Sequence, residues 1–247
     1  MAIKIQIPAT PLNVFKTGLL RKGDETWYKW ALKSIWKHYG PIFRECEAMH
    51  NVPAEVMCTL VSIELPDSSE PALRKRMERI VTGDPKTGAT GMCQINCYAA
   101  DLALREEAQA DNLSQEEIAY FRSKLGARYD TIMGKGSFGQ YRGRNGAVVH
   151  TIKDLSDPTY NIHIGTLHFG QLLRQHTGAD GVMRIDRAIP RYNGSSAPIP
   201  PAGASVAAVI ASQKGKNKGR DKNTTFKYIL KFIGTGGGMD LLTKNQA

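Results

Sequence analysis

The sequence lacks any long apolar run, since no segment approaches the ~18 to 20 uninterrupted apolar residues of a membrane-spanning helix. The first residues, Met1 to Pro8, also lack the apolar stretch and the small-residue cleavage site of a secretory signal. We therefore expect a protein without a membrane span that is made in the cytoplasm. If it acts outside the cell membrane, another carrier must bring it there.

Cysteine is scarce, with four residues at Cys46, Cys58, Cys93 and Cys97. Their spacing matches no zinc-ligand pattern, because the Cys93–Cys97 pair has no second pair to complete it. Two of the four lie in apolar segments, which favours free, buried thiols in a reducing compartment. A Cys58–Cys93 disulfide is the alternative. The cysteine spacing thus predicts no zinc site.

Acidic residues are too few to balance the basic ones, and the formal net charge is +10. A positive surface attracts polyanions, among them peptidoglycan with its teichoic polymers, and DNA. The same charge also serves solubility, so charge alone selects no partner. The apolar fraction of 41% suffices for a sizeable core, and 247 residues suit one domain with appendages.

Residues 1–23 are predicted to form an extended N-terminal arm. Ile3, Ile5 and Ile7 alternate with polar residues at the strand-like period of two, and prolines follow. Such an arm is too short to fold alone, so it needs a docking surface.

Residues 24–201 are predicted to form a mainly helical domain, because apolar side chains recur at helical spacing. Gly40-Pro41 should interrupt the first helix. Ser114 with Glu117 forms a capping-box pattern, which predicts a helix start. All three tryptophans fall in the first helical stretch: Trp27, Trp30 and Trp36. They could form a sugar-stacking platform, but aromatic residues at this spacing more often belong to a core.

Residues 202–247 are predicted to form a basic linker and a C-terminal docking segment. The stretch 213–223 is polar and basic, and a short apolar patch follows at 226–233. The patch is too small to bury itself, so it should dock on the domain or on a partner. We expect this segment and the N-terminal arm to serve assembly and not catalysis.

One carboxylate stands at the end of the most apolar segment. Pro53 opens the run 56–63, as suits a residue in a first helical turn, and Glu64 closes it. The run is too apolar for a solvated helix, so we expect it in the core. A carboxylate there is costly to ionise, which is the property of a general acid at neutral pH. The alternative is a helix-terminal glutamate that points into water.

Three later segments follow Glu64 in a fixed order: 88–96 (GATGMCQIN), 157–165 (DPTYNIHIG) and 188–194 (AIPRYNG). Together they resemble the soluble lytic transglycosylases, relatives of goose-type lysozyme. In that family the catalytic glutamate is followed by G-A-x-G-L-M-Q-I, P-x-x-N-I-x-x-G and A-x-x-Y-N-x-G segments. The resemblance spans residues 52–196. It implies a mainly α, lysozyme-like domain with a small β element, flanked by the two extended appendages.

The resemblance implies a role for each motif residue. Glu64 would be the catalytic acid and base, and Tyr192 would hydrogen-bond and orient it. Gln94 would bind the glycan strand, although a glutamine that caps the core is the alternative. The further substrate-side candidates are Met92, Ile95, Asn193 and Arg191. Asn161 and Ile162 would stabilise the fold.

The sequence also departs from the family pattern. Leu65 replaces the serine that commonly follows the catalytic glutamate, and residues 65–88 contain an insertion. Cys93 stands where the family has methionine, and Arg191 precedes Tyr192 where the family has alanine. Arg191 could therefore contact a peptide stem or a phosphate, or face solvent.

The implied reaction is cleavage of the MurNAc–GlcNAc β-1,4 bond of peptidoglycan with a 1,6-anhydromuramoyl product. One glutamate suffices, because the nucleophile is the C6 hydroxyl of the same sugar. The resemblance implies no metal and no organic cofactor. A hydrolytic muramidase would usually need a second carboxylate. Its candidates, Asp67, Glu70 and Asp84, all lie in the insertion and in no motif.

The expected setting is a phage particle that opens the cell wall for genome delivery, because a wall enzyme without an export signal needs another carrier. The protein would be made in the host cytoplasm, act in the periplasm and cell wall, and contact tail or internal virion proteins. A free endolysin and a structural virion protein with a degenerate lysozyme fold are the alternatives. The joint presence of Glu64, Gln94 and Tyr192 argues against degeneracy.

Overall fold

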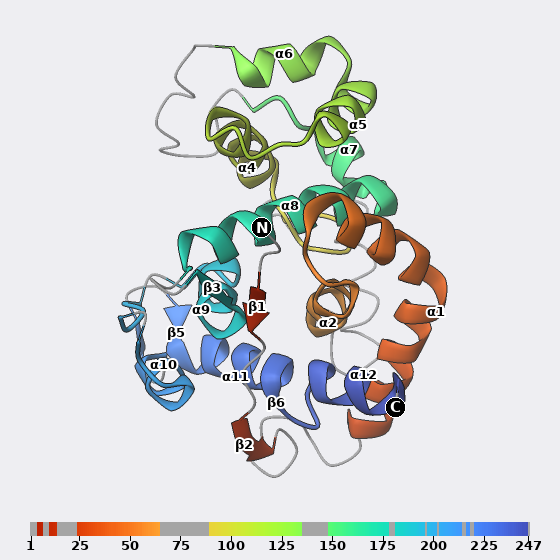
Figure 1. Ribbon diagram of the computed structural model, residues 1–247. Coiled ribbons are helices and arrows are strands. Elements are labelled where there is room, and N and C mark those ends of the chain that lie inside the picture. Colours follow the sequence, from red (N-terminus) through yellow and green to blue (C-terminus); the bar gives the residue numbers. More distant parts are fainter. Residues whose placement is uncertain are drawn as a thin grey trace.

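Helices dominate the described part of the chain in this computed structural model, which confirms the predicted mainly α class (Figure 1). The structure describes residues 4–6, 10–13, 24–64, 89–134, 148–177, 181–195, 197–201, 203–213, 216–217 and 220–246. The helices are α1 (Asp24–His50), α2 (Ala54–Glu64), α4 (Cys97–Gln109), α5 (Gln115–Leu125), α6 (Ala127–Met133), α7 (Ile152–Ser156), α8 (Pro158–Gln175), α9 (Ile185–Tyr192), α10 (Val206–Ser212), α11 (Lys222–Ile233) and α12 (Gly238–Gln246). The strands are β1 (Lys4–Gln6), β2 (Thr10–Asn13), β3 (Val182–Arg184), β4 (Lys216–Asn217), β5 (Arg220–Asp221) and β6 (Gly234–Thr235).

The first helix, α1, does not break at Gly40-Pro41, so that prediction is wrong. A proline inside a helix removes one backbone hydrogen bond, and packing on both sides can offset the loss. Here the Trp36 ring stacks on Phe43 at 6.3 Å between ring centroids, and Phe43 is fully buried. Trp30 was expected in the core but is 58% exposed, whereas Trp36 packs partly buried against it. The Trp27 side chain lies outside the described residues.

The buried side chains form two clusters, one on each side of α8. We call the cluster of α1, α2, α9, α11 and α12 the large lobe, and that of α4 to α7 the small lobe (Figure 1). One face of α8 packs in the large lobe and the opposite face packs in the small lobe. On each face the apolar residues recur every three or four positions, as expected for a helix. The large-lobe face carries Ile162, Phe169 and Leu173, and the small-lobe face carries Tyr160, Ile164 and Leu167.

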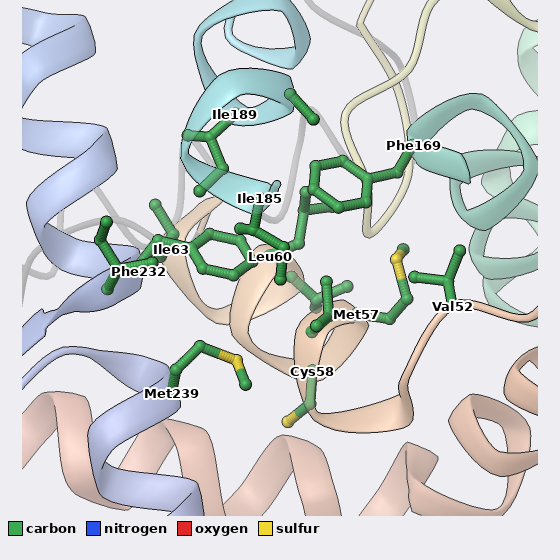
Figure 2. Close-up of a cluster of buried hydrophobic side chains, with 14 of the residues drawn as sticks. Val52, Met57, Cys58, Leu60, Ile63, Phe169, Ile185, Ile189, Phe232 and Met239 are labelled. Carbon is green, nitrogen blue, oxygen red and sulfur yellow. The ribbon is translucent and has the colours of Figure 1, made fainter. Parts of the chain in front are cut away.

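In the large lobe, α2 is the central element. Figure 2 shows Leu60 and Ile63 of α2 among Ile185 and Ile189 of α9 and Phe232 of α11. Every residue from 56 to 63 is at most 6% exposed. The expectation that this apolar run lies in the core is therefore confirmed.

Both ends of the chain pack on the large lobe. Strand β1 pairs in parallel with β3, with Lys4 opposite Val182, and β2 pairs in parallel with β6, with Thr10 opposite Gly234. The N-terminal arm thus finds its docking surface on its own chain.

The C-terminal helices α11 and α12 belong to the large-lobe core. Their buried residues include Tyr228, Ile229, Leu230, Phe232 and Met239. A Cβ at Gly238 would lie 2.5 Å from the Thr59 side chain, so the start of α12 sits directly on α2. The apolar patch therefore docks on the domain itself, and a role for this segment in assembly alone does not fit its packing.

In the small lobe, α5 begins where the capping box predicted. The Glu117 backbone N–H donates to Ser114 Oγ at 3.1 Å, and the Ser114 N–H donates to Glu117 Oε2 at 2.7 Å. Each side chain satisfies one of the backbone donors that a helix start leaves open.

Polar groups are buried in the small lobe. Asp101 accepts hydrogen bonds from the backbone N–H groups of Val149 (2.6 Å) and His150 (3.1 Å), and its carboxylate also contacts the His150 ring. The other ring nitrogen of His150 lies 2.5 Å from the Tyr160 hydroxyl. Through this network the chain segment at 148–150 is fixed against α4 and α8.

The four cysteines are free thiols, as expected, and Cys58 and Cys93 form no disulfide. Cys46, Cys58 and Cys93 are buried, and Cys97 is half-buried. Within the described ranges, no helix is both long enough and apolar enough to cross a bilayer.

Candidate active site

Helix α2 brings Glu64 from the core to a half-buried position at its last residue. The residues that follow, 65–88, lie outside the described residues. They include Leu65 and the alternative carboxylates Asp67, Glu70 and Asp84. The described surroundings of Glu64 therefore come from other parts of the chain.

Tyr228 of α11 donates a hydrogen bond from its hydroxyl to Glu64 Oε1 at 2.7 Å. Burial, reinforced by the neighbouring Glu64 carboxylate, raises the pKa of Tyr228 well above its ordinary value. The hydroxyl thus keeps its proton and remains a donor to Glu64. Sequence reasoning missed this residue, which lies 164 positions from its partner. The sequence did contain one signal: Tyr228 lies in the apolar patch 226–233, which was expected to dock. A tyrosine buried by docking needs a polar partner for its hydroxyl.

Asn161 fastens the segment 89–95 to α8. Its Oδ1 accepts a hydrogen bond from the Cys93 N–H at 2.7 Å. Its Nδ2 donates to the carbonyl oxygens of Thr90 (3.1 Å) and Leu155 (3.0 Å). Asn161 is fully buried, so the expectation that it stabilises the fold agrees with its contacts.

Two glycines allow the close approach of this segment to α8. Gly91 has φ +74°, and a Cβ there would lie 2.1 Å from Asn161 Nδ2. At Gly165 a Cβ would lie 2.6 Å from Cys93 Sγ. Both distances are far below van der Waals contact, so neither position accepts a larger residue without a shift of the backbone.

Tyr192, the last residue of α9, donates its hydroxyl hydrogen to the Cys93 carbonyl oxygen at 2.7 Å. Cys93 is therefore held at its N–H by Asn161 and at its carbonyl by Tyr192. Tyr192 and Cys93, like Glu64, also act electrostatically on Tyr228, which puts the four residues in one neighbourhood. Tyr228 is one donor to Glu64, and the Cys93 carbonyl is one acceptor for Tyr192. The predicted hydrogen bond from Tyr192 to Glu64 stays a prediction.

Gln94 closes the turn at 91–94. Its backbone has φ +50°, uncommon for a residue other than glycine, and its Nε2 donates to the Gly91 carbonyl oxygen at 2.8 Å. The side chain is half-buried. Its predicted contact with a glycan remains a prediction, and its described role is to hold the turn.

Two predicted substrate-binding residues point into the cores and not toward a surface. Met92 is 8% exposed in the large-lobe cluster, and Ile95 is 3% exposed in the small-lobe cluster. Contact of either side chain with a glycan stays a prediction that this burial does not support. In the structure both residues anchor the segment 89–95 between the lobes. They are apolar, and burial is their most favourable environment.

Asn193 and Arg191 stabilise the chain after α9. The Asn193 amide donates to Thr225 Oγ1 of α11 at 3.1 Å. The Arg191 guanidinium donates to the Ser195 carbonyl oxygen at 2.6 Å. One contact of Arg191 is therefore made within the chain itself, and its predicted contact with substrate stays a prediction. Through Asn193 the last motif is joined to the helix that carries Tyr228.

Comparisons of this chain with protein-family models, with curated proteins and with solved structures found no match. A functional assignment therefore depends on the residues and contacts described above. Chemically, the site offers one half-buried carboxylate with a tyrosine donor and a firmly held backbone segment in the same neighbourhood.

Proposed function

We propose that this chain is a peptidoglycan lytic transglycosylase with a lysozyme-like domain. It would cleave the MurNAc–GlcNAc β-1,4 bond and leave a 1,6-anhydromuramoyl end. The observation that carries the proposal is Glu64 at the end of a buried helix, hydrogen-bonded by Tyr228 at 2.7 Å. The motif segments that hold Cys93 adjoin this pair.

In the proposed reaction Glu64 first donates its proton to the glycosidic oxygen, and the bond from that oxygen to C1 of the muramoyl sugar breaks. The Glu64 carboxylate then takes the proton of the C6 hydroxyl, and O6 closes onto C1. Protons balance, and Glu64 returns to its starting form. The nucleophile belongs to the substrate, so the entropy of positioning it is already met.

Tyr228 supports this cycle as a fixed donor. A hydrogen bond to a carboxylate favours its charged form, which Glu64 adopts between the two proton transfers. The same bond holds the carboxylate in one orientation. Because burial raises the pKa of the Tyr228 hydroxyl, the tyrosine gives up no proton of its own during the cycle.

Glu64→Gln in the full chain, assayed on purified peptidoglycan, tests the proposal. The amide keeps the shape but cannot carry a proton through the cycle, so we expect turnover to fall by roughly 10³-fold or more. Glu55→Gln, on the first turn of the same helix, is the matched control and should retain activity. Turnover of Glu64→Gln within a few-fold of the wild-type rate would exclude Glu64 as the acid.

Product analysis separates the alternatives. Mass spectrometry of the released muropeptides should find 1,6-anhydro ends. Reducing ends would instead assign a hydrolytic muramidase. A folded wild-type chain without any cleavage would favour a structural protein with a degenerate fold.

We also propose that the protein is carried in a phage particle. Mass spectrometry of purified particles tests this part separately, since a virion component is found in the washed particles. An endolysin would be found in the lysate and not in the particles.

A further inference from the structure

Three side chains of metal-binding type meet in the interior between α1 and α8. The Cys46 Sγ and one ring nitrogen each of His50 and His163 all lie within 4.8 Å of one another, and all three residues are buried. Cys46 and His50 stand four residues apart on α1, which places them on the same helix face. His163 reaches them from α8.

The two imidazoles already have the separation that a tetrahedral ion requires. His50 Nε2 lies 3.2 Å from His163 Nδ1. Two nitrogens that each bind zinc at ~2.0–2.1 Å and tetrahedral angles are about 3.3 Å apart. Little movement of the two rings is therefore needed to admit an ion.

A carboxylate orients one of these rings. His50 Nδ1 lies 2.6 Å from Glu117 Oε1, and the other oxygen of Glu117 accepts the Ser114 N–H at 2.7 Å. Because the carboxylate accepts a hydrogen bond from the protonated Nδ1, the lone pair of His50 lies on Nε2, the atom that faces His163. A histidine that binds metal through one nitrogen and donates to a carboxylate through the other is the usual arrangement around metal ions.

His163 contains a buried ring nitrogen, Nε2, that would gain a hydrogen-bond acceptor once an ion binds the other ring nitrogen, Nδ1. Its Nε2 has no hydrogen-bond partner within the described ranges and lies 3.5 Å from Glu45 Oε1. To bond His50 Nε2, His163 must carry its proton on Nδ1, which leaves the Nε2 lone pair facing a carboxylate. An ion on Nδ1 moves the proton to Nε2, where Glu45 can accept it.

We propose that Cys46, His50 and His163 bind one Zn²⁺ ion, with a water molecule in the fourth position. One thiolate and two imidazoles are the donors that zinc accepts, whereas Mg²⁺ and Ca²⁺ prefer oxygen ligands. On binding, the Cys46 thiol releases its proton to solvent and a sulfur–zinc bond forms without any redox change.

The ion would join the two lobes. Cys46 belongs to the large-lobe cluster, and Glu117, which orients His50, belongs to α5 of the small lobe. His163 lies on α8 between them. The site shares no residue with the chemistry proposed at Glu64.

A Co²⁺ titration of the tag-free, chelator-treated full chain tests the site. Cobalt replaces zinc in tetrahedral sites, and a thiolate ligand then gives a near-ultraviolet charge-transfer band. We expect one ion per chain and this band in the wild type. Cys46→Ser should lose the band, and Cys97→Ser, which changes a half-buried thiol elsewhere, should keep it.

Glu117→Gln gives a second measurement that does not depend on the thiol. Glutamine preserves the capping box, but it weakens the orientation of His50, so the metal affinity should fall ~10–100-fold. If Cys46→Ser fails to fold, the metal affinity of Glu117→Gln alone tests the proposed site. An unchanged affinity in Glu117→Gln, a band that survives in Cys46→Ser, or a wild type that binds no ion would overturn the proposal and leave a hydrogen-bonded core cluster.

Discussion

The large lobe is closed by apolar contacts between segments far apart in the sequence, whereas the small lobe is one nearly continuous stretch with buried polar contacts. In the large lobe, α2 packs on α9, α11 and α12 (Figure 2). In the small lobe, Asp101, His150 and Tyr160 form a buried chain of contacts, and Arg128 pairs with Asp154 at 2.7 Å. The candidate acid Glu64 thus lies in the lobe whose integrity depends on the chain ends.

The largest expected effect is that of removing residues 222–247. The deletion takes at least five buried side chains from the large lobe, each contributing about 1.5–3 kcal/mol, against a typical total stability of ~5–15 kcal/mol. We expect the large lobe to unfold, which circular dichroism and thermal melting would register. A truncated chain that melts like the wild type would show that the C-terminal helices are separable, as the sequence alone suggested.

Asn161→Ala should have the next largest effect, because Asn161 binds the segment that bridges the lobes. Three hydrogen bonds of a buried side chain are lost, for a cost of about 3 kcal/mol in the free energy of unfolding. Chemical denaturation measures the loss, and the exposed Gln109→Ala is the control. Equal stability of the two variants would mean that the segment 89–95 is held by its apolar residues alone.

Tyr228→Phe should lower turnover about tenfold, a loss near 1.4 kcal/mol, since it removes a donor to Glu64 and little volume. Stability should change by only about 1 kcal/mol. Tyr192→Phe is the matched comparison, because it removes an equally short bond to the Cys93 carbonyl. Rate measurements at saturating substrate would contradict the assignment if Tyr192→Phe lowered turnover and Tyr228→Phe did not.

The smallest expected effect is a loosening of the small lobe in acid. Burial alone would raise the pKa of Asp154, but hydrogen bonds from Arg128 and Thr151 outweigh it and hold this pKa well below its usual range. The resulting stability is fully present above pH ~4, the unfolded value, and is lost as the pH falls toward the folded pKa. Because the Arg128 side chain is 41% exposed, solvent screening limits the effect to about 1 kcal/mol.

Hydrogen exchange resolves that effect by lobe. Protection factors, which correct for the pH dependence of intrinsic amide exchange, should fall in α6 and α7 between pH 5 and pH 3 more than in α2 and α11. Asp154→Asn should show the lower protection factors already at neutral pH. Equal falls in both lobes would remove the electrostatic distinction between them.

Local patterns predicted the elements but not their partners. The apolar run before Glu64, the capping box at Ser114 and the strand-like arm all describe neighbours in sequence, and the structure agrees with each. Pro41 was expected to end a helix, but tertiary packing of Phe43 overrides the local preference. Trp30 follows the helical spacing yet lies on the exposed face of α1.

The long-range contacts of the site could not be read from spacing. Tyr228 is 164 residues from Glu64, and nothing near either residue specifies the pairing. Likewise Cys46 and His50 match no zinc pattern in sequence, because His163 is 113 residues from His50. The resemblance assigned Tyr192 to Glu64, whereas its hydrogen bond to the Cys93 carbonyl, across 99 residues, was not predicted.

The pairing of β2 with β6 sets the order in which the protein can be completed during synthesis. Strand β2 leaves the ribosome more than 200 residues before its partner at Gly234–Thr235, and Glu64 leaves 164 residues before the Tyr228 hydroxyl. The described small-lobe cluster draws on residues 95 to 167, so it can form on the nascent chain before α11 is made. Glu64 therefore gains its tyrosine donor only after α11 is synthesised, and a ribosome that stalls between α8 and α11 leaves a chain with a formed small lobe and no assembled site.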